Sequence, residues 1–101
     1  MPESRTFTDV NQALFDATKK ASQQAHKTTY DPPAGNKGTS TTHVPLIGDI
    51  VVGFEFNPEA KSITYTIVSL PKSGIPSANQ VFDGIDSTIR ASRHTLATRS
   101  Q

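Results

Sequence analysis

The stretch that decides the fold is residues 46–70, which read LIGDIVVGFEFNPEAKSITYTIVSL. Large apolar residues alternate with small or polar residues in two runs, as they do in strands that bury one face. These residues are Ile50, Val52, Phe54 and Phe56 in the first run and Ile63, Tyr65 and Ile67 in the second. Asn57 and Pro58, which separate the runs, suit the first half of a type I turn. The stretch therefore predicts an antiparallel β-hairpin.

The register of this hairpin follows from its apolar pattern. If Phe56 faces Ile63, every large apolar residue of both runs lies on one face, whereas a slip by one residue would scatter them. The other predicted pairs are Phe54 with Tyr65, Val52 with Ile67, Glu55 with Thr64, Gly53 with Thr66 and Val51 with Val68. The second face is then mostly small and polar, and it can meet water.

This second face is the candidate interaction surface, because it presents side chains that the core does not need. Its residues are Val51, Glu55, Thr64, Thr66 and Val68.

A first helix is predicted before the hairpin, within residues 6–25, because apolar residues recur at spacings of three and four. Its apolar positions are Val10, Leu14, Ala17 and Ala21. Thr6 or Thr8 offers a side-chain oxygen to cap the first turn. Two of the four apolar positions are alanine, so this helix depends on close packing against the sheet.

A second helix is predicted after the hairpin, where Ser77 and Gln80 have the spacing of a capping box. Its apolar stripe consists of Val81, Phe82, Ile85, Ile89 and Leu96. Gly84 interrupts the helix and is expected to mark a close approach to the sheet. Residues 95–101 are mostly small or polar and are expected to form a flexible tail.

Residues 28–43 are rich in Thr, Ser, Gly and Pro and are predicted to form a long loop. Residues 39–44, with three threonines and a valine, could instead supply a third strand at the sheet edge. An isolated two-stranded hairpin is marginal in water. Either this third strand extends the sheet, or two chains pair edge to edge as a symmetric dimer.

The fold class is therefore α+β, with an N-terminal helix, a central antiparallel hairpin, an optional third edge strand and a C-terminal helix. Both helices are expected on the apolar face of the sheet. A length of 101 residues fits a single domain spanning residues 1–101.

Composition excludes several classes of function. The chain has no cysteine, which removes disulfides, thiolate catalysis and iron–sulfur ligands. Its 10 Lys and Arg balance 9 Asp and Glu, so no overall field draws it to nucleic acid or an anionic membrane. The apolar runs are too short to span a bilayer, and the start of the chain lacks the apolar core of a secretory signal. We expect no membrane partner and, by default, a cytoplasmic location, with export that needs no such signal left open.

The sequence holds no grouping typical of catalysis. The histidines His26, His43 and His94 lie in separate segments without the spacing of a metal site. Asp83 and Asp86 are close in sequence, but near a helix start they simply complement the helix dipole. No glycine pattern indicates a phosphate-binding loop. We therefore predict no catalytic residue, no metal and no cofactor, and a protein that is not an enzyme.

The first hypothesis for function is a non-enzymatic interaction or assembly module whose partner is a protein, most simply a second copy of the chain. It would act through the sheet edge and the candidate interaction surface. The alternative is a nucleic-acid-binding protein that uses the basic residues near the C-terminus, Arg90, Arg93 and Arg99. A third option, a small enzyme or ligand-binding protein, needs polar groups that converge from separate segments.

Overall fold

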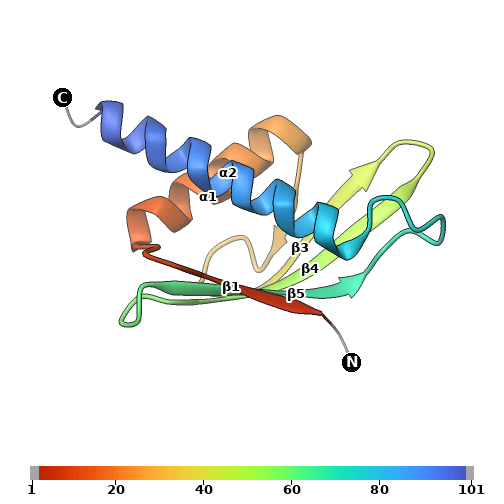
Figure 1. Ribbon diagram of the computed structural model, residues 1–101, viewed down its shortest axis with the longest axis horizontal. Helices are drawn as coiled ribbons and strands as arrows, with labels where there is room; N and C mark the ends of the chain where they lie inside the picture. The colour runs from red at the N-terminus through yellow and green to blue at the C-terminus, as the bar shows by residue number, and fades with distance from the viewer. Residues whose placement is uncertain (1–2, 100–101) are drawn as a thin grey trace.

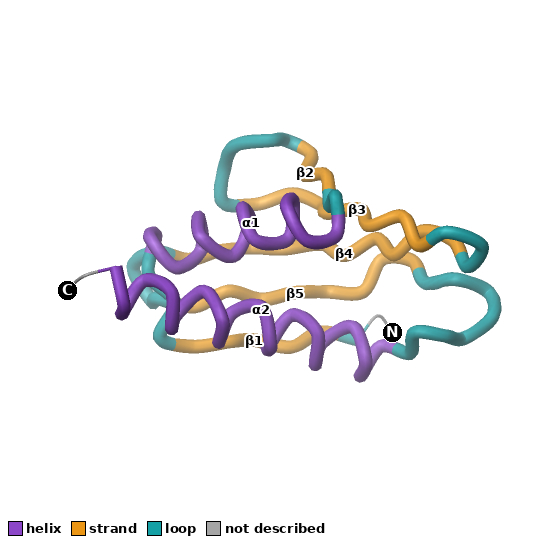
Figure 2. The backbone as a smooth tube through the Cα atoms, turned by 90° about the horizontal axis from the view of Figure 1, so that it is seen from above, coloured by secondary structure: helices purple, strands orange, loops and turns teal. Residues whose placement is uncertain are grey.

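A five-stranded antiparallel sheet carries two helices on one face in the computed structural model, which describes residues 3–99 without the side chain of Arg99 (Figure 1). The elements follow in the order β1 (Ser4–Thr8), α1 (Gln12–His26), β2 (Thr29–Asp31), β3 (Lys37–Val44), β4 (Gly48–Asn57), β5 (Ser62–Ser69) and α2 (Ala78–Arg99). The strand order across the sheet is β1-β5-β4-β3-β2. Seen from above, α1 and α2 lie side by side along the strands (Figure 2). The predicted α+β class, with both helices on one face, is confirmed.

The hairpin formed by β4 and β5 has the predicted register over most of its length. Phe56 faces Ile63, and Glu55 faces Thr64 on the other side of the sheet. The predicted pair of Val51 with Val68 is wrong, because the register shifts between Val51 and Val52 and places Val51 opposite Ser69. One extra residue on β5 is accommodated at this point, as in a β-bulge.

The N-terminal segment differs from the prediction. Residues 4–8 form strand β1, which pairs with β5, rather than the start of a helix. Helix α1 begins only at Gln12, and its cap is Asn11, whose side-chain oxygen accepts a hydrogen bond of 2.8 Å from the Leu14 N–H. Neither Thr6 nor Thr8 is the cap, because both belong to the strand.

The middle segment also differs, since residues 28–43 hold strand β2 and most of β3 where we predicted a loop. The option of a third strand is confirmed, and β3 begins earlier than expected, at Lys37. Gly38 permits the tight approach of β2 and β3, because a Cβ at this position would clash with the Asp31 carbonyl. The sheet therefore needs no second chain to complete it.

Helix α2 begins with the predicted capping box. The Ser77 N–H donates to Gln80 Oε1 over 2.8 Å, and the Gln80 N–H donates to Ser77 Oγ over 3.3 Å. The helix continues to Arg99, so the tail predicted for residues 95–101 is wrong for residues 95–99, and the last two residues lie outside the described part. Leu96 explains the extension, because it packs against the core.

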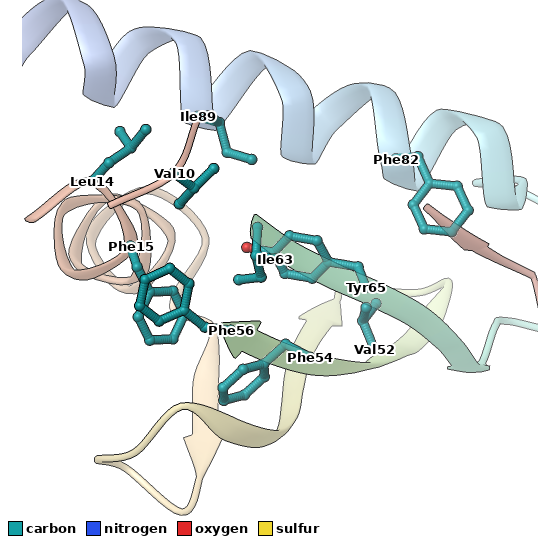
Figure 3. Close-up of a cluster of buried hydrophobic side chains, with 10 residues drawn as sticks. All are labelled: Val10, Leu14, Phe15, Val52, Phe54, Phe56, Ile63, Tyr65, Phe82 and Ile89. Atoms are coloured by element: carbon teal, nitrogen blue, oxygen red, sulfur yellow. The ribbon is translucent and has the colours of Figure 1, made fainter. Parts of the chain in front are cut away.

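The core fills the space between the helices and the sheet (Figure 3). Its buried residues are Val10, Leu14, Phe15, Val52, Phe54, Phe56, Ile63, Tyr65, Phe82 and Ile89. The rings of Phe15 and Phe56 stack with centroids 4.6 Å apart, which joins α1 to β4. These contacts fix the helices over the apolar face and leave the opposite face of the sheet uncovered.

Gly84 does not mark a close approach, since a Cβ added there would have no atom within 4 Å. We therefore expect Gly84→Ala to raise the free energy of unfolding by about 1 kcal/mol, because alanine restricts the unfolded chain and favours helix. Urea denaturation followed by circular dichroism would measure the change. Gly74→Ala is the matched control: it also enters open space, but its φ of +78° should make alanine destabilising. A loss of stability in Gly84→Ala would contradict the geometry.

Candidate functional site

Hydroxyl groups dominate the uncovered face of the sheet. Three strands each carry a Thr-X-Thr segment, with threonines at 6 and 8 on β1, 39 and 41 on β3, and 64 and 66 on β5. Because successive side chains of a strand point to opposite faces, the threonines share the uncovered face while Tyr65 enters the core. The Thr6 and Thr64 hydroxyls hydrogen-bond across the strands over 2.8 Å.

A shallow hollow of about 440 Å³ lies near the centre of this face. Gly53 forms part of its floor, and Thr39 on β3 and Thr66 on β5 are its direct cross-strand neighbours. Other lining residues are Lys37, Gly38, Phe54, Glu55 and Thr64. The hollow exists because the central position has no side chain while the flanking strands carry threonines.

The two charged residues that line the hollow neutralise each other. Lys37 Nζ lies 3.7 Å from Glu55 Oε1, and both side chains are well exposed. An exposed pair of this kind contributes little to stability. Its effect is to place one positive and one negative group beside an otherwise neutral, hydroxyl-lined surface.

The structure brings most of the candidate interaction surface to this hollow. Glu55, Thr64 and Thr66 line it directly. Val68 adjoins it, since a Cβ built on Gly53 would lie 3.7 Å from Val68 Cγ2. Val51 follows along β4, opposite Thr41 and Ser69. Sequence reasoning missed Lys37 because it lies in the predicted loop, and Thr39 because the pairing of the optional third strand with β4 was not predicted.

The candidate nucleic-acid contacts are engaged within the chain. Arg90 Nε lies 3.0 Å from Asp86 Oδ2, one helical turn earlier. Arg93 Nη2 donates to the Asp9 carbonyl over 3.3 Å, tying α2 to the segment before α1. The side chain of Arg99 lies outside the described part of the structure. Of the three candidate arginines, the two whose side chains are described thus have partners within the chain.

A second feature that the sequence did not reveal is a group of exposed apolar residues at one end of the sheet. Leu46 and Ile47, in the turn between β3 and β4, and Ile75, in the loop before α2, are all exposed. The two loops lie at the same end of the molecule in both views (Figures 1 and 2). Leu46 has a φ of +67°, a conformation that leucine rarely adopts.

Within residues 3–99, no three His, Cys, Asp or Glu side chains gather as they would around a metal ion. Neither described helix is long and apolar enough to cross a membrane. Comparison with known proteins gave no matching family model, no matching curated protein and no matching solved structure.

Proposed function

We propose that this protein is a non-enzymatic interaction module that self-associates by placing the uncovered sheet faces of two copies against each other. The observation that supports this proposal is the hydroxyl-lined hollow over Gly53, on the face that no helix covers. It brings together three of the five residues that the sequence indicated for interaction.

The chemistry of the face suits a second copy of itself. A threonine hydroxyl both donates and accepts hydrogen bonds, so a surface of threonines is complementary to an identical surface. Lys37 and Glu55 supply one charge of each sign, so two copies meet without net repulsion. Two sheets that pack face to face are a common arrangement of β-structure.

The same chemistry makes the association weak and reversible. Permanent dimers bury mostly apolar surface, whereas this face has small and polar side chains with apolar groups only around Val51 and Val68. The monomer already has its own core and a complete sheet, so folding does not depend on association.

Gly53→Arg is expected to abolish self-association while leaving the fold intact. A Cβ at Gly53 meets its neighbours at 3.7–3.8 Å, which is ordinary contact, so the new side chain would extend from the floor of the hollow. In sedimentation velocity over a concentration series, the average mass of the wild type should rise from that of one chain toward that of two chains. The mass of the variant should remain that of one chain. Val68→Lys, at the border of the hollow, should weaken association less.

Ala91→Arg is the matched control, since it adds the same group to an exposed position of α2. It should associate as the wild type does. A wild type that stays monomeric at every concentration, or a Gly53→Arg variant that associates normally, would contradict the proposal.

No observation favours the nucleic-acid alternative as a second function; Arg90 and Arg93 are exposed, and each has a partner within the chain. Absorbance at 260 nm in the natively purified protein, lost in high salt, would reverse this judgement.

A further inference from the structure

A second cavity, on the opposite side of the sheet from the hollow, lies between α1, α2 and the apolar face. It has a volume of about 260 Å³. Residues that line it include Ser22 of α1, Tyr30, Ile50 and Tyr65 of the strands, and Ile85 and Thr88 of α2. It therefore lies where the C-terminal half of α1 and the N-terminal half of α2 cover the sheet.

The Tyr65 hydroxyl is the unusual group in this cavity. The Tyr65 residue as a whole is only 7% exposed, and among residues 3–99 its hydroxyl has no hydrogen-bond partner. In Figure 3 the ring lies over the sheet, with the hydroxyl on the side that faces α1. The described part of the chain has one fully buried side-chain polar atom without a partner, Ser92 Oγ, so the Tyr65 oxygen itself is not fully buried. A phenol hydroxyl that has no protein partner and reaches open space can donate a hydrogen bond to an occupant of that space.

Other hydroxyls around the cavity do have partners. Thr28 and Thr42 share a hydrogen bond of 2.7 Å, and Ser22 Oγ donates to the Thr18 carbonyl over 3.0 Å. Thr88 Oγ1 donates to the Gly84 carbonyl over 2.9 Å. These hydroxyls are thus satisfied by the fold, whereas the Tyr65 hydroxyl retains a free donor at the cavity wall.

The lining also restricts the charge of an occupant. It contains no Lys, Arg, Asp or Glu among the described residues, and His26 at the end of α1 is the one basic side chain there, so a charged molecule would gain little in exchange for the hydration it loses. Burial raises the pKa of the Tyr65 phenol, and the neighbouring Tyr30 phenol raises it further, so the group stays protonated at neutral pH. Tyr65 therefore offers a hydrogen-bond donor to a neutral acceptor.

We propose that this cavity binds a small, neutral, largely apolar molecule whose single acceptor oxygen receives a hydrogen bond from the Tyr65 hydroxyl. A cavity of ~150 Å³ is known to hold benzene, so the present volume suits roughly ten non-hydrogen atoms. The site is independent of self-association, because it lies on the helix side of the sheet.

Three probes of similar size test the proposal on the full chain: acetophenone, ethylbenzene and benzoate. Acetophenone has a neutral hydrogen-bond acceptor, ethylbenzene has none, and benzoate has a charged one. NMR titration of the ¹⁵N-labelled protein should show shifts at Ser22 and Thr88 but none at Thr64. Acetophenone should bind about fivefold to tenfold more tightly than ethylbenzene, the value of one hydrogen bond, and also more tightly than benzoate.

Tyr65→Phe keeps the ring and removes only the hydroxyl, so it should fold and reduce the preference for acetophenone over ethylbenzene to about one. Ile85→Phe, which adds bulk to the cavity wall, should weaken both probes equally and provides a second test if Tyr65→Phe misfolds. If none of the three probes shifts the amide signals of the residues that line the cavity, the proposal is overturned. An acetophenone preference that survives in Tyr65→Phe would also overturn it.

Discussion

Thr66→Pro is expected to unfold the domain. Thr66 lies in β5, which has β4 on one side and β1 on the other, and it faces both Gly53 and Ser4. Proline removes the N–H that the ladder requires and is found only at sheet edges or bulges. The free energy of unfolding should fall by at least about 3 kcal/mol. An interstrand hydrogen bond disappears, and leaving its carbonyl partner unpaired costs roughly a further 1–3 kcal/mol. The ring also displaces a neighbouring strand.

Far-ultraviolet circular dichroism and urea denaturation would measure this loss. Thr66→Ala is the control, since it shortens the side chain but keeps the N–H, and it should remain folded with a small change in midpoint. A cooperative transition near the wild-type midpoint in Thr66→Pro would show that β5 is not an interior strand.

Phe56→Ala is expected to destabilise the protein by about 3–5 kcal/mol, the usual cost of emptying a buried aromatic site. Phe56 is 3% exposed, faces Ile63 across the hairpin and stacks on Phe15 of α1. A small domain has a free energy of unfolding near the lower end of about 5–15 kcal/mol, so most of its stability would be lost. Urea denaturation monitored by circular dichroism measures the change.

The stacked pair permits a more specific test. Phe15→Leu and Phe56→Leu should each be tolerated, and their double variant should lose less stability than the sum of the single variants by about 0.5–1.5 kcal/mol. Strict additivity would mean that the two rings, which nearly parallel each other at 17°, contribute separately.

The hairpin and α2 could be predicted from sequence because their signals are local. Phe54 and Tyr65 belong to runs with a strict period of two, and Ser77 and Gln80 cap α2 within one turn. Strand β1 was missed because it has only five residues, and its threonines resemble helix caps. Strand β3 was only partly found, because glycine and proline in the preceding residues are typical of loops.

The candidate site could be predicted only in part for a related reason. Glu55 and Thr64 follow from the hairpin register, whereas Lys37 reaches the hollow only through the pairing of β3 with β4. The pattern places Tyr65 in the core but gives no sign that its hydroxyl lacks a partner, because that depends on every element packed around it. The alternation of apolar and polar residues likewise gives no sign of the extra residue in β5 that moves Val68 out of register.

The short edge strands have a consequence for how copies of this chain can assemble. Strand β1 has five residues, and β2 has three and pairs with only residues 39–41 of β3, so the unpaired backbone groups at each border of the sheet are divided into short segments. Brief borders are poor templates for adding one chain after another, which is how fibrils grow. Contact through the uncovered faces, by contrast, uses up both surfaces once two copies have met. If two copies associate as we propose, a closed pair is favoured over an open-ended polymer, even where the concentration of the protein is high.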